Sequence, residues 1–350
     1  MMRAMSSSLS GVSSFGHRGG SSRVSRDWTC PHSSRVRPRV VASSASTVSV
    51  PEEREALSYR EHLFSSVDLW STKRRASLPG GGTELDASTE PKFTLTYMPM
   101  RNRAEVCRLI LEDAGCHYNF DVVGFETWQN EVKPAAVAGD FRGDFGKLPV
   151  LVSHDKTLAL PDGTPLKIGQ ETAITRFLAK QCGVAGNSDM EEARLDSLFA
   201  FYFATFRNDG TTHAGDKYSA DALADEAEKT DTERLTRLKC TSYRASKRVN
   251  TLSVAERSLS ALCLFEEILE KSESNYLLSR KEPSYVDLAL LCELLELAEE
   301  DHVPDFSERF DLPNLGKLLE VMKQRPGIDA YLNSPRRMPR YERPGYNYIQ

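Results

Sequence analysis

A tyrosine, a proline and a polar helix start stand out near the middle of the chain as residues that could do chemistry. Tyr97 ends an alternating segment, residues 93–97, that predicts a strand, and a helical pattern begins soon afterwards at Arg103. A phenol can donate a hydrogen bond to a thiolate and thereby lower the pKa of a thiol, which is ordinarily about 8.5. The start of the following helix adds positive potential nearby. The alternative is an ordinary tyrosine of the core or of a strand edge.

Two later segments could hold the partner of such a tyrosine. Pro149 falls inside a predicted strand at residues 148–152, where a proline removes a ladder hydrogen bond and therefore needs a reason. Gln170, Glu171 and Thr172 open a helical pattern that ends before Gly183. The unpaired N–H groups of such a helix start bind carboxylates.

Several short motifs in a fixed order resemble the cytosolic glutathione transferase family, most closely its sigma-like classes, which use a tyrosine. Each motif alone is weak, but the ordered set is specific and covers about residues 92–335. The motifs are Leu95-Thr96-Tyr97 before Arg103-Ala104-Glu105, Trp128 with Lys133, Gly146-Lys147-Leu148-Pro149-Val150-Leu151, Gln170 before Ala173-Ile174, Ser284-Tyr285-Val286-Asp287-Leu288-Ala289, Leu312-Pro313-Asn314-Leu315 and Arg325-Pro326-Gly327-Ile328.

The element pattern and the resemblance together predict a two-domain architecture. We expect an α/β thioredoxin-like, glutathione-binding domain at residues 92–186, followed by an all-α helical domain at 187–335 that carries an insertion at about 208–254. The expected strands are 93–97, 118–123, 148–152 and a hairpin partner at 158–168 with an Asp162-Gly163 turn. The expected helices are 103–113, 128–138, 172–182, 195–206, 255–269, 285–298 and 315–323.

The resemblance also implies roles for individual residues. Tyr97 matches the catalytic tyrosine that stabilises the glutathione thiolate. Pro149 matches a cis proline that aims the main chain of Leu148 at the cysteinyl backbone of glutathione. The positions implied to bind glutathione are Arg103, Trp128, Lys133, Lys147, Leu148, Pro149, Gln170, Glu171 and Thr172.

Glu171 is the largest departure from the family pattern, which has a serine at this place. A carboxylate there repels the γ-glutamyl carboxylate of the ligand unless it turns outward or pairs with the ligand's ammonium group. A shift by one residue would give the role to Thr172 instead. The plain alternative is an acidic residue of the first turn that stabilises the helix dipole.

Ser284 and Asp287 precede an apolar run and form an expected capping box, in which the acid reaches back to the free N–H groups of the helix start. This motif resembles the buried capping motif of the family's helical domain. We expect it to serve folding rather than catalysis.

The resemblance implies an enzyme that uses glutathione as co-substrate, needs no metal, conjugates the thiolate to small apolar electrophiles in detoxification, and forms a homodimer. Peroxidase or isomerase chemistry remains open beside conjugation. The alternative is a non-catalytic scaffold or interaction module, as transferase-like domains are in lens crystallins and in the elongation-factor gamma subunit. Glu171 and the insertion favour this alternative, whereas Tyr97 and the turn at Leu148-Pro149 favour the enzyme.

The start of the chain has the composition of an organelle transit peptide. Residues 1–42 hold seven arginines and one acid, Asp27, and therefore carry +6, which leaves −11 for the rest of the chain. The serine-rich, lysine-free composition without an apolar core favours a plastid address, with a mitochondrion or the cytoplasm as alternatives. We expect a largely disordered polar linker at 43–91, with one short helix near 52–70 and a break at Pro79-Gly80-Gly81-Gly82, and a tail at 336–350.

Composition excludes several other classes. The seven cysteines show no C-x-x-C pair and no spacing of metal ligands, so we expect reduced thiols and no metal. The acidic remainder of the chain offers no electrostatic footprint for nucleic acid. No run approaches the ~18 apolar residues of a membrane-spanning helix.

Overall fold

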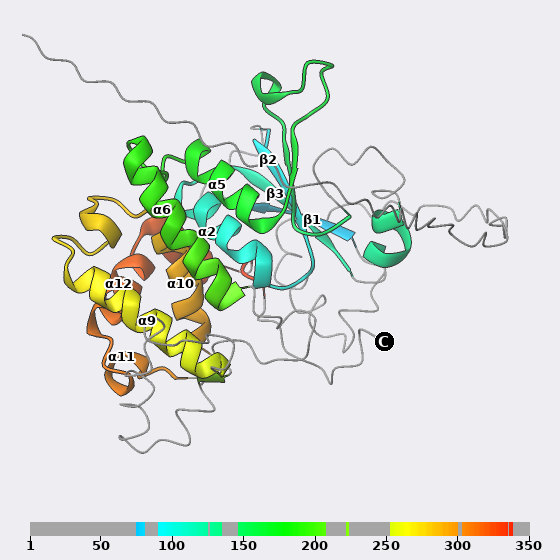
Figure 1. Cartoon of the computed structure of the whole chain (residues 1–350). Helices are drawn as coiled ribbons and strands as arrows, with labels where there is room; N and C mark the ends of the chain where they lie inside the picture. Colours follow the sequence, from blue (N-terminus) through cyan, green and yellow to red (C-terminus); the bar gives the residue numbers. More distant parts are fainter. Residues whose placement is uncertain are drawn as a thin grey trace, which may run out of the picture. The chain divides into compact units, whose positions relative to one another are not determined.

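A mixed sheet of five strands forms the first half of the structure (Figure 1). The computed structural model describes residues 75–80, 90–124, 127–134, 146–207, 222–223, 253–299, 303–334 and 336–338. All of them belong to the unit Pro51–Gln350. The predicted transit peptide, the helix near 52–70, most of the insertion at 208–254 and most of the tail lie outside the described residues.

The strands are β1 (Arg75–Gly80), β2 (Phe93–Tyr97), β3 (Tyr118–Val123), β4 (Val150–Ser153) and β5 (Lys167–Gly169), in the spatial order β1-β3-β2-β4-β5. Strands β2 and β3 are parallel, while the other neighbouring pairs are antiparallel. A parallel pair needs a crossover connection, and α2 (Glu105–Asp113), entered through the 3-10 turn η1 (Asn102–Ala104), supplies it.

Alternation along β2 fixes which side chains enter the core. Phe93, Leu95 and Tyr97 are buried, whereas Thr94 and Thr96 are partly exposed. The other helix of this half, α5 (Glu171–Gln181), follows β5 and packs against α2. The order strand–helix–strand, then two antiparallel strands and a helix, is that of a thioredoxin-like domain, as expected.

In the described residues after α5, all the regular elements are helices, as predicted for an all-helical second domain. They are α6 (Asp189–Tyr202), the π-helical turn η4 (Phe203–Arg207), α9 (Val254–Glu270), the 3-10 turn η6 (Leu277–Ser279), α10 (Tyr285–Ala298), α11 (Phe306–Arg309), α12 (Pro313–Lys323) and α13 (Pro326–Leu332). The chain thus has a thioredoxin-like N-terminal part followed by an all-α part.

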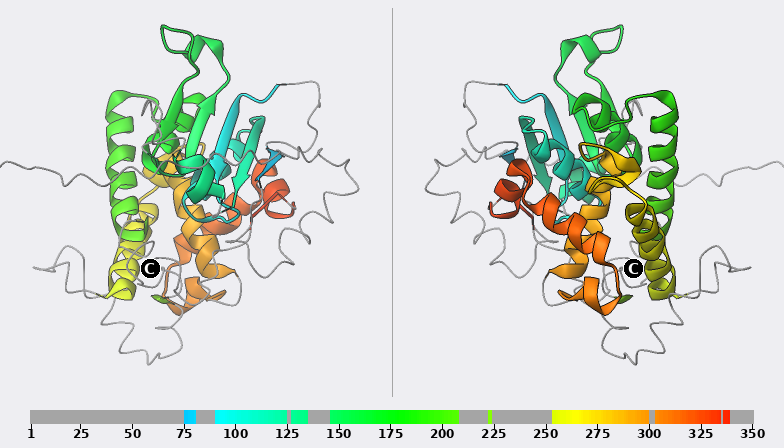
Figure 2. Two further views of the ribbon diagram at one scale, coloured as in Figure 1. Left: turned by 90° about the vertical axis from the view of Figure 1, so that its right-hand side faces the viewer. Right: turned by 90° about the vertical axis from the view of Figure 1, so that its left-hand side faces the viewer.

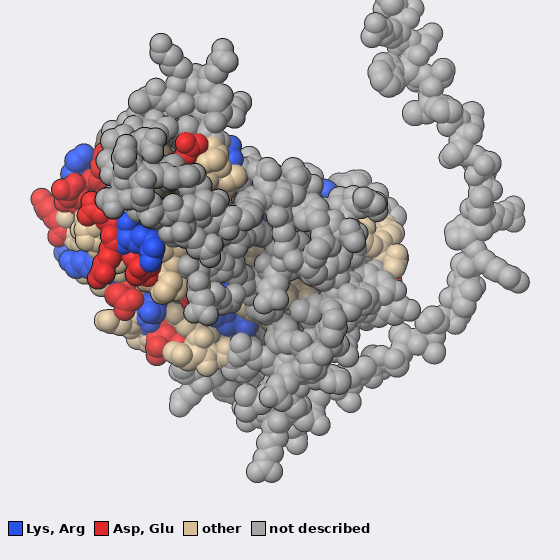
Figure 3. All heavy atoms as spheres, turned by 90° about the horizontal axis from the view of Figure 1, so that it is seen from below, with Lys and Arg blue, Asp and Glu red and all other residues tan. Residues whose placement is uncertain are grey.

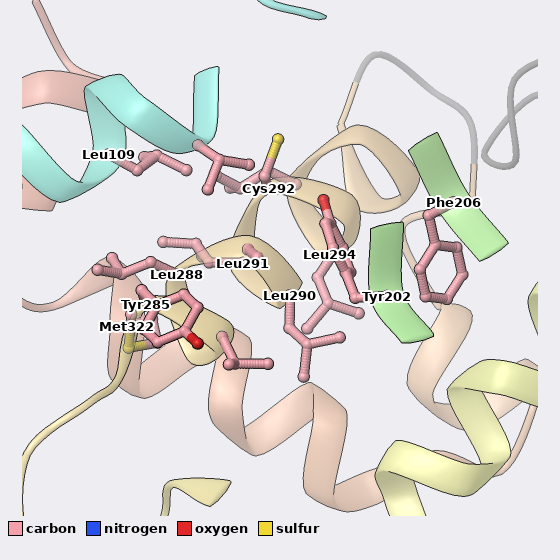
Figure 4. Packing of buried hydrophobic residues seen from close by; sticks show 14 of the residues in the cluster. Leu109, Tyr202, Phe206, Tyr285, Leu288, Leu290, Leu291, Cys292, Leu294 and Met322 are labelled. Carbon is pink, nitrogen blue, oxygen red and sulfur yellow. The ribbon is translucent and has the colours of Figure 1, made fainter. Parts of the chain in front are cut away.

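Helix α10 is buried along almost its whole length and joins the two parts. It packs against α2 and α5 of the first part and against α6 and α12 of the second. Figure 4 shows Leu109 of α2 and Tyr202 of α6 on different sides of the α10 residues Leu291 and Leu294. A second contact is made by α13, which lies against α2 (Figure 2). A Cβ added at Gly327 there would collide with the carbonyl oxygen of Glu112, so the approach depends on glycine.

The capping box at the start of α10 is confirmed. The Ser284 hydroxyl accepts hydrogen bonds from the N–H groups of Val286 and Asp287, at 3.2 and 3.4 Å. The Asp287 carboxylate accepts from the Ser284 N–H at 2.7 Å and from the Leu277 N–H at 2.9 Å. A second capping box, Ser253 with Glu256, starts α9 and was not predicted from the sequence.

Several expected elements differ in detail. Strand β1 occupies residues 75–80, where the sequence predicted a linker that breaks at Pro79-Gly80. That break is wrong because β1 pairs with β3 along its whole length. The expected hairpin strand at 158–168 is reduced to β5, since Asp162-Gly163 forms a turn with Gly163 at φ 82° and the chain pairs only from Lys167. Helix α11 was not expected. The described part of the expected helix 128–138 is helical through residue 134, with a π-helical turn, η2 (Trp128–Val132).

Acidic and basic side chains lie intermingled on the face shown in Figure 3. Among the described helices, none combines the length and apolarity needed to cross a lipid bilayer. Within the described residues, no group of three or more His, Cys, Asp or Glu side chains is arranged to hold a metal ion.

Candidate active site

Three neighbouring strands bring the predicted residues to one end of the sheet. In the antiparallel pair β2–β4, Thr96 faces Val150, so the next residue of β2, Tyr97, lies level with Pro149. In the pair β4–β5, Val150 faces Gly169, so Gln170 also follows at the same end. Three segments far apart in sequence therefore converge on one edge of the sheet, where the helices α2 and α5 both begin.

Tyr97 is buried, with 5% of its surface exposed, and its hydroxyl lies at the start of the helical segment that leads into α2. The backbone N–H of Arg103 donates a hydrogen bond to the hydroxyl oxygen at 3.4 Å. Burial raises the pKa of Tyr97 to about 12, against the lowering effect of the Arg103 charge. The phenol therefore keeps its proton at neutral pH, and no acceptor for this proton is found among the residues that the structure describes.

Glu171 is held between two arginines, Arg103 and Arg207. Its carboxylate accepts from the Arg103 guanidinium at 3.5 Å and from the Arg207 guanidinium at 3.3 Å. The side chain is 4% exposed, and burial raises the pKa of Glu171 although both arginines lower it. Of the alternatives left open by the sequence, an outward-turned Glu171 is therefore wrong, because the side chain points into the protein and is neutralised there.

Arg207 was missed by the sequence analysis. It ends the π-helical turn η4, is 8% exposed, and donates to the carbonyl oxygen of Asn102 at 2.6 Å in addition to its bonds with Glu171. The Arg103 guanidinium in turn donates to the Arg207 carbonyl oxygen at 3.1 Å. An arginine directly after Phe206 in an apolar helical pattern is the signal that could have found it, since a buried arginine needs a carboxylate partner.

Trp128 and Lys133 lie on the segment around η2. Trp128 is buried, and its backbone N–H donates to the Gly124 carbonyl oxygen at 2.8 Å. Lys133 is partly buried, and its Nζ lies 3.5 Å from the Oε1 atom of Gln129 on the previous helical turn. Their roles toward a ligand remain predictions.

The turn before β4 has the backbone that the sequence predicted. The peptide bond between Leu148 and Pro149 is cis. Lys147 is exposed, Leu148 is partly buried against the hydrophobic core, and Pro149 is buried. This turn holds the main chain of Leu148 beside the end of β2, at the edge where Tyr97 lies.

The start of α5 presents polar groups at the same edge. Gln170 is exposed and has φ 73°, a left-handed conformation that is uncommon for residues other than glycine. Thr172 is partly buried in the first turn of the helix. With Glu171 neutralised by two arginines, the dipole of α5 stays positive at this end, as an anionic ligand requires.

This arrangement can bind an extended, anionic peptide and stabilise an anion on it. The main chain beside a cis proline offers edge hydrogen bonds, the helix start offers N–H groups, and the phenol of Tyr97 offers one proton. These are the groups that a thiolate held on a small peptide needs.

Parts of the chain are similar in sequence to known proteins. Residues 235–335 match the family model of the glutathione S-transferase C-terminal domain. The probable glutathione S-transferase 6 of Caenorhabditis elegans is 37% identical over 117 residues, which make up 33% of this chain and 48% of that protein. Glutathione S-transferase P of Bos taurus is 25% identical over 252 residues, 71% of this chain and 96% of that protein.

The crystal structure of the glutathione S-transferase from Ascaris lumbricoides is 27% identical, covers 70% of this chain and 100% of that one, and has a TM-score of 0.46. The chain spans about half the length of the first curated relatives that it matches, 48% and 44%. The chain is thus similar to glutathione S-transferases over these segments.

Proposed function

We propose that the chain is a glutathione S-transferase of the tyrosine-using type, in which Tyr97 stabilises the glutathione thiolate. One observation carries the proposal. The Tyr97 hydroxyl accepts its hydrogen bond from the Arg103 backbone, keeps its own proton because its pKa is about 12, and has no described acceptor for that proton. Such a phenol is ready to donate to an anion at the edge of the sheet.

The proposed reaction follows from this geometry. The thiol of glutathione loses its proton to solvent, and the thiolate sulfur accepts the hydrogen bond from Tyr97. The sulfur then forms a bond to an electrophilic carbon, and the leaving group departs with the electron pair of the bond that breaks. A hydrogen bond to a charged group stabilises it by roughly 1.5–3 kcal/mol, which lowers the pKa of the bound thiol by about one to two units.

The clamp of Glu171 by two arginines supports glutathione binding rather than opposing it. The ion pairs with Arg103 and Arg207 neutralise the negative charge of Glu171 inside the protein. The γ-glutamyl carboxylate then meets the start of α5 without a bare carboxylate facing it. Gln170 and Thr172, at the same helix start, are the proposed side-chain contacts of the γ-glutamyl group, while the main chain of Leu148 takes the cysteinyl group.

Further parts of the proposal rest on the sequence and on the family. The second substrate is a small apolar electrophile, consistent with a detoxifying enzyme, and conjugation stands beside peroxidase or isomerase chemistry. We propose a homodimer, because the family is usually dimeric. The serine- and arginine-rich composition of residues 1–42 supports a plastid address.

A second candidate function is a glutathione-transferase-like module without catalysis. The observation that favours it is the position of Arg103, whose guanidinium already binds Glu171 and the Arg207 carbonyl oxygen. An arginine engaged in this way offers less charge to a carboxylate of the ligand than the sequence predicted. This candidate predicts weak or absent glutathione binding.

Retention on immobilised glutathione, followed by a turnover assay with a chromogenic electrophile, tests the two candidates. A transferase is retained, elutes with free glutathione and turns over the electrophile. Retention without turnover contradicts the enzyme, and it also contradicts the weak or absent glutathione binding that the second candidate predicts. Failure to bind, in protein whose unfolding transition shows it to be folded, contradicts the proposal that the edge of the sheet holds glutathione.

A further inference from the structure

The peptide group between Asn102 and Arg103 lies between a buried arginine, Arg207, and the hydroxyl of Tyr97. Its N–H donates to the Tyr97 hydroxyl oxygen at 3.4 Å. Its carbonyl oxygen accepts from the Arg207 guanidinium at 2.6 Å, as short as bonds from charged donors are. Two hydrogen bonds through one peptide group therefore connect a fixed positive charge to the hydroxyl that the proposed function uses.

The side chain of Arg207 has little freedom to turn away from this peptide. It is 8% exposed, and its Nε and Nη2 atoms both lie 3.3 Å from the Oε1 atom of Glu171. The backbone carbonyl oxygen of Arg207 also accepts from the Arg103 guanidinium at 3.1 Å. The guanidinium is thus fixed in the orientation that directs Nη2 at the Asn102 carbonyl oxygen.

The segment that carries Arg207 is anchored in the helical part of the chain. The π-helical turn η4 continues α6 and ends at Arg207. The buried rings of Tyr202 and Phe206 on this segment lie side by side, with their centroids 5.5 Å apart (Figure 4). Single π-helical turns at helices are frequent at functional sites. Through Arg207, this helix end contacts a peptide group of the thioredoxin-like part.

The peptide group needs such support. Asn102 has φ 38°, a left-handed conformation that is uncommon for residues other than glycine and persists only when the surroundings hold it. At 3.4 Å, the hydrogen bond from the Arg103 N–H to Tyr97 is long, so its strength depends on how firmly the peptide is oriented. The bond from Arg207 to the carbonyl oxygen holds the N–H end toward the tyrosine.

We propose that Arg207 is a positioning residue of the thiolate site, which orients and polarises the Asn102–Arg103 peptide so that Tyr97 donates a stronger hydrogen bond to the glutathione thiolate. This role rests on the proposed function of Tyr97. A carbonyl oxygen that accepts from a cation makes the N–H of the same peptide a stronger donor, and a hydroxyl that accepts a stronger bond donates a stronger one. Each hydrogen bond in such a chain strengthens the next by about 10–30%.

The charges around Tyr97 agree with this role. Arg103 and Arg207 share the one carboxylate of Glu171, so these three residues together carry a surplus positive charge. Burial raises the pKa of Tyr97, while both arginines lower it. A direct effect of this charge on the thiolate would act without the Tyr97 hydroxyl as well. The two effects are therefore separated by changing Arg207 with and without that hydroxyl.

The test is the ultraviolet titration of the bound thiolate in the wild type, in Arg207→Met, in Tyr97→Phe and in the double variant. Arg207→Met should raise the pKa of the bound thiol by about 0.2–0.6, which is 10–30% of the roughly two units that Tyr97 contributes. Turnover near neutral pH should fall about two- to fourfold. In the Tyr97→Phe background, Arg207→Met should cause no further rise, because the hydroxyl through which it acts is missing.

Arg280→Met is the matched control. Arg280 is also 8% exposed, and its guanidinium pairs with the Glu191 carboxylate and donates to the Ala185 carbonyl oxygen at 3.1 Å. This variant should lower the unfolding midpoint and leave the pKa of the bound thiol unchanged. If Arg207→Met does not fold because Glu171 has lost a partner, the comparison is made in the Glu171→Gln background, where no buried carboxylate needs the arginine. The same rise is expected there.

Three results would overturn the role of Arg207. An unchanged thiol pKa in Arg207→Met, while Tyr97→Phe raises it, removes this role and leaves the proposed function intact. A rise of equal size with and without the Tyr97 hydroxyl shows a direct charge effect instead. Identical titration curves for the wild type and Tyr97→Phe remove the proposed function of Tyr97 and the role of Arg207 with it.

Discussion

The buried capping box offers the sharpest stability prediction. Asp287 is fully buried at the start of α10, and its carboxylate accepts from the N–H groups of Ser284 and Leu277 and from the Ser284 hydroxyl at 2.6 Å. Truncation in Asp287→Ala removes all three acceptor contacts at once. Two buried backbone N–H groups then lose their partners, and one of them belongs to a different segment, the turn η6.

The magnitude follows from these contacts. Each buried donor left without a partner costs about 1–3 kcal/mol, and loss of an N-terminal cap costs about 0.5–2 kcal/mol. The net loss is smaller than the sum of these costs, because burial of the wild-type carboxylate is itself unfavourable: it raises the pKa of Asp287 and so disfavours the charged form. We expect Asp287→Ala to lower the free energy of unfolding by about 3–5 kcal/mol.

The second capping box supplies a matched control. Glu256 makes the same reciprocal bonds with Ser253, at 2.7 and 3.1 Å, but Ser253 is exposed and Glu256 only partly buried. Water can replace the lost contacts there, so Glu256→Ala should cost only about 0.5–1 kcal/mol. The assay is denaturant unfolding of both variants, with the shift of the midpoint converted at a constant slope.

An equal loss of unfolding free energy in the two variants would contradict this prediction. Equal losses would mean that burial and the bond to Leu277 add nothing to an ordinary helix cap. A large loss only in Asp287→Ala, with the glutathione affinity of the folded fraction unchanged, would support a role in folding rather than in binding.

Three further predictions concern other parts of the chain. Burial raises the pKa of Glu299, but its ion pairs, chiefly with Arg337, outweigh burial and hold this pKa below the ordinary 4.5. The ion pairs therefore stabilise the fold above that pH, and this stabilisation is lost as the pH falls below it. Glu299→Gln should flatten the dependence of the unfolding midpoint on pH, and an unchanged slope would contradict the pairing. Gly327→Ala should lower the unfolding midpoint, since the added methyl group meets the Glu112 carbonyl oxygen, and a midpoint equal to that of the wild type would show that the helices separate without cost. Residues 1–60 fused to a fluorescent protein should direct it to a plastid, and diffuse cytosolic fluorescence would remove the transit-peptide proposal.

Most of the fold could be predicted because its strands and helices are specified by patterns of neighbouring residues. Residues 93–97 alternate between buried and partly exposed side chains, which is the two-residue period of a strand. Ser284 and Asp287 mark the start of a helix, and the long apolar run after them became α10. The cis bond at Leu148-Pro149 was predicted only through the resemblance to the glutathione transferase family, because a proline at the edge of a strand can equally be trans.

What escaped prediction depends on contacts between distant segments. Strand β1 ends in Pro79-Gly80, which locally breaks structure, and its pairing with β3 decides the outcome. The clamp around Glu171 joins residues from three helical segments, so no local pattern shows that Arg207 neutralises it.

Whether the Tyr97 phenol stabilises a glutathione thiolate can be measured directly by ultraviolet titration of the bound thiolate in the wild type and in Tyr97→Phe. The substitution keeps the ring and removes one hydrogen bond to a charged group, worth roughly 1.5–3 kcal/mol. Tyr285→Phe serves as the control, because its hydroxyl bonds Asp196 in the helical part, at 2.9 Å.

We predict that the pKa of the bound thiol rises by about one to two units in Tyr97→Phe and stays unchanged in Tyr285→Phe. Turnover of a chromogenic electrophile near neutral pH should fall about ten- to a hundred-fold, while glutathione affinity changes little. Identical titration curves for the wild type and Tyr97→Phe, with activity retained, would contradict the claim and make Tyr97 a structural tyrosine.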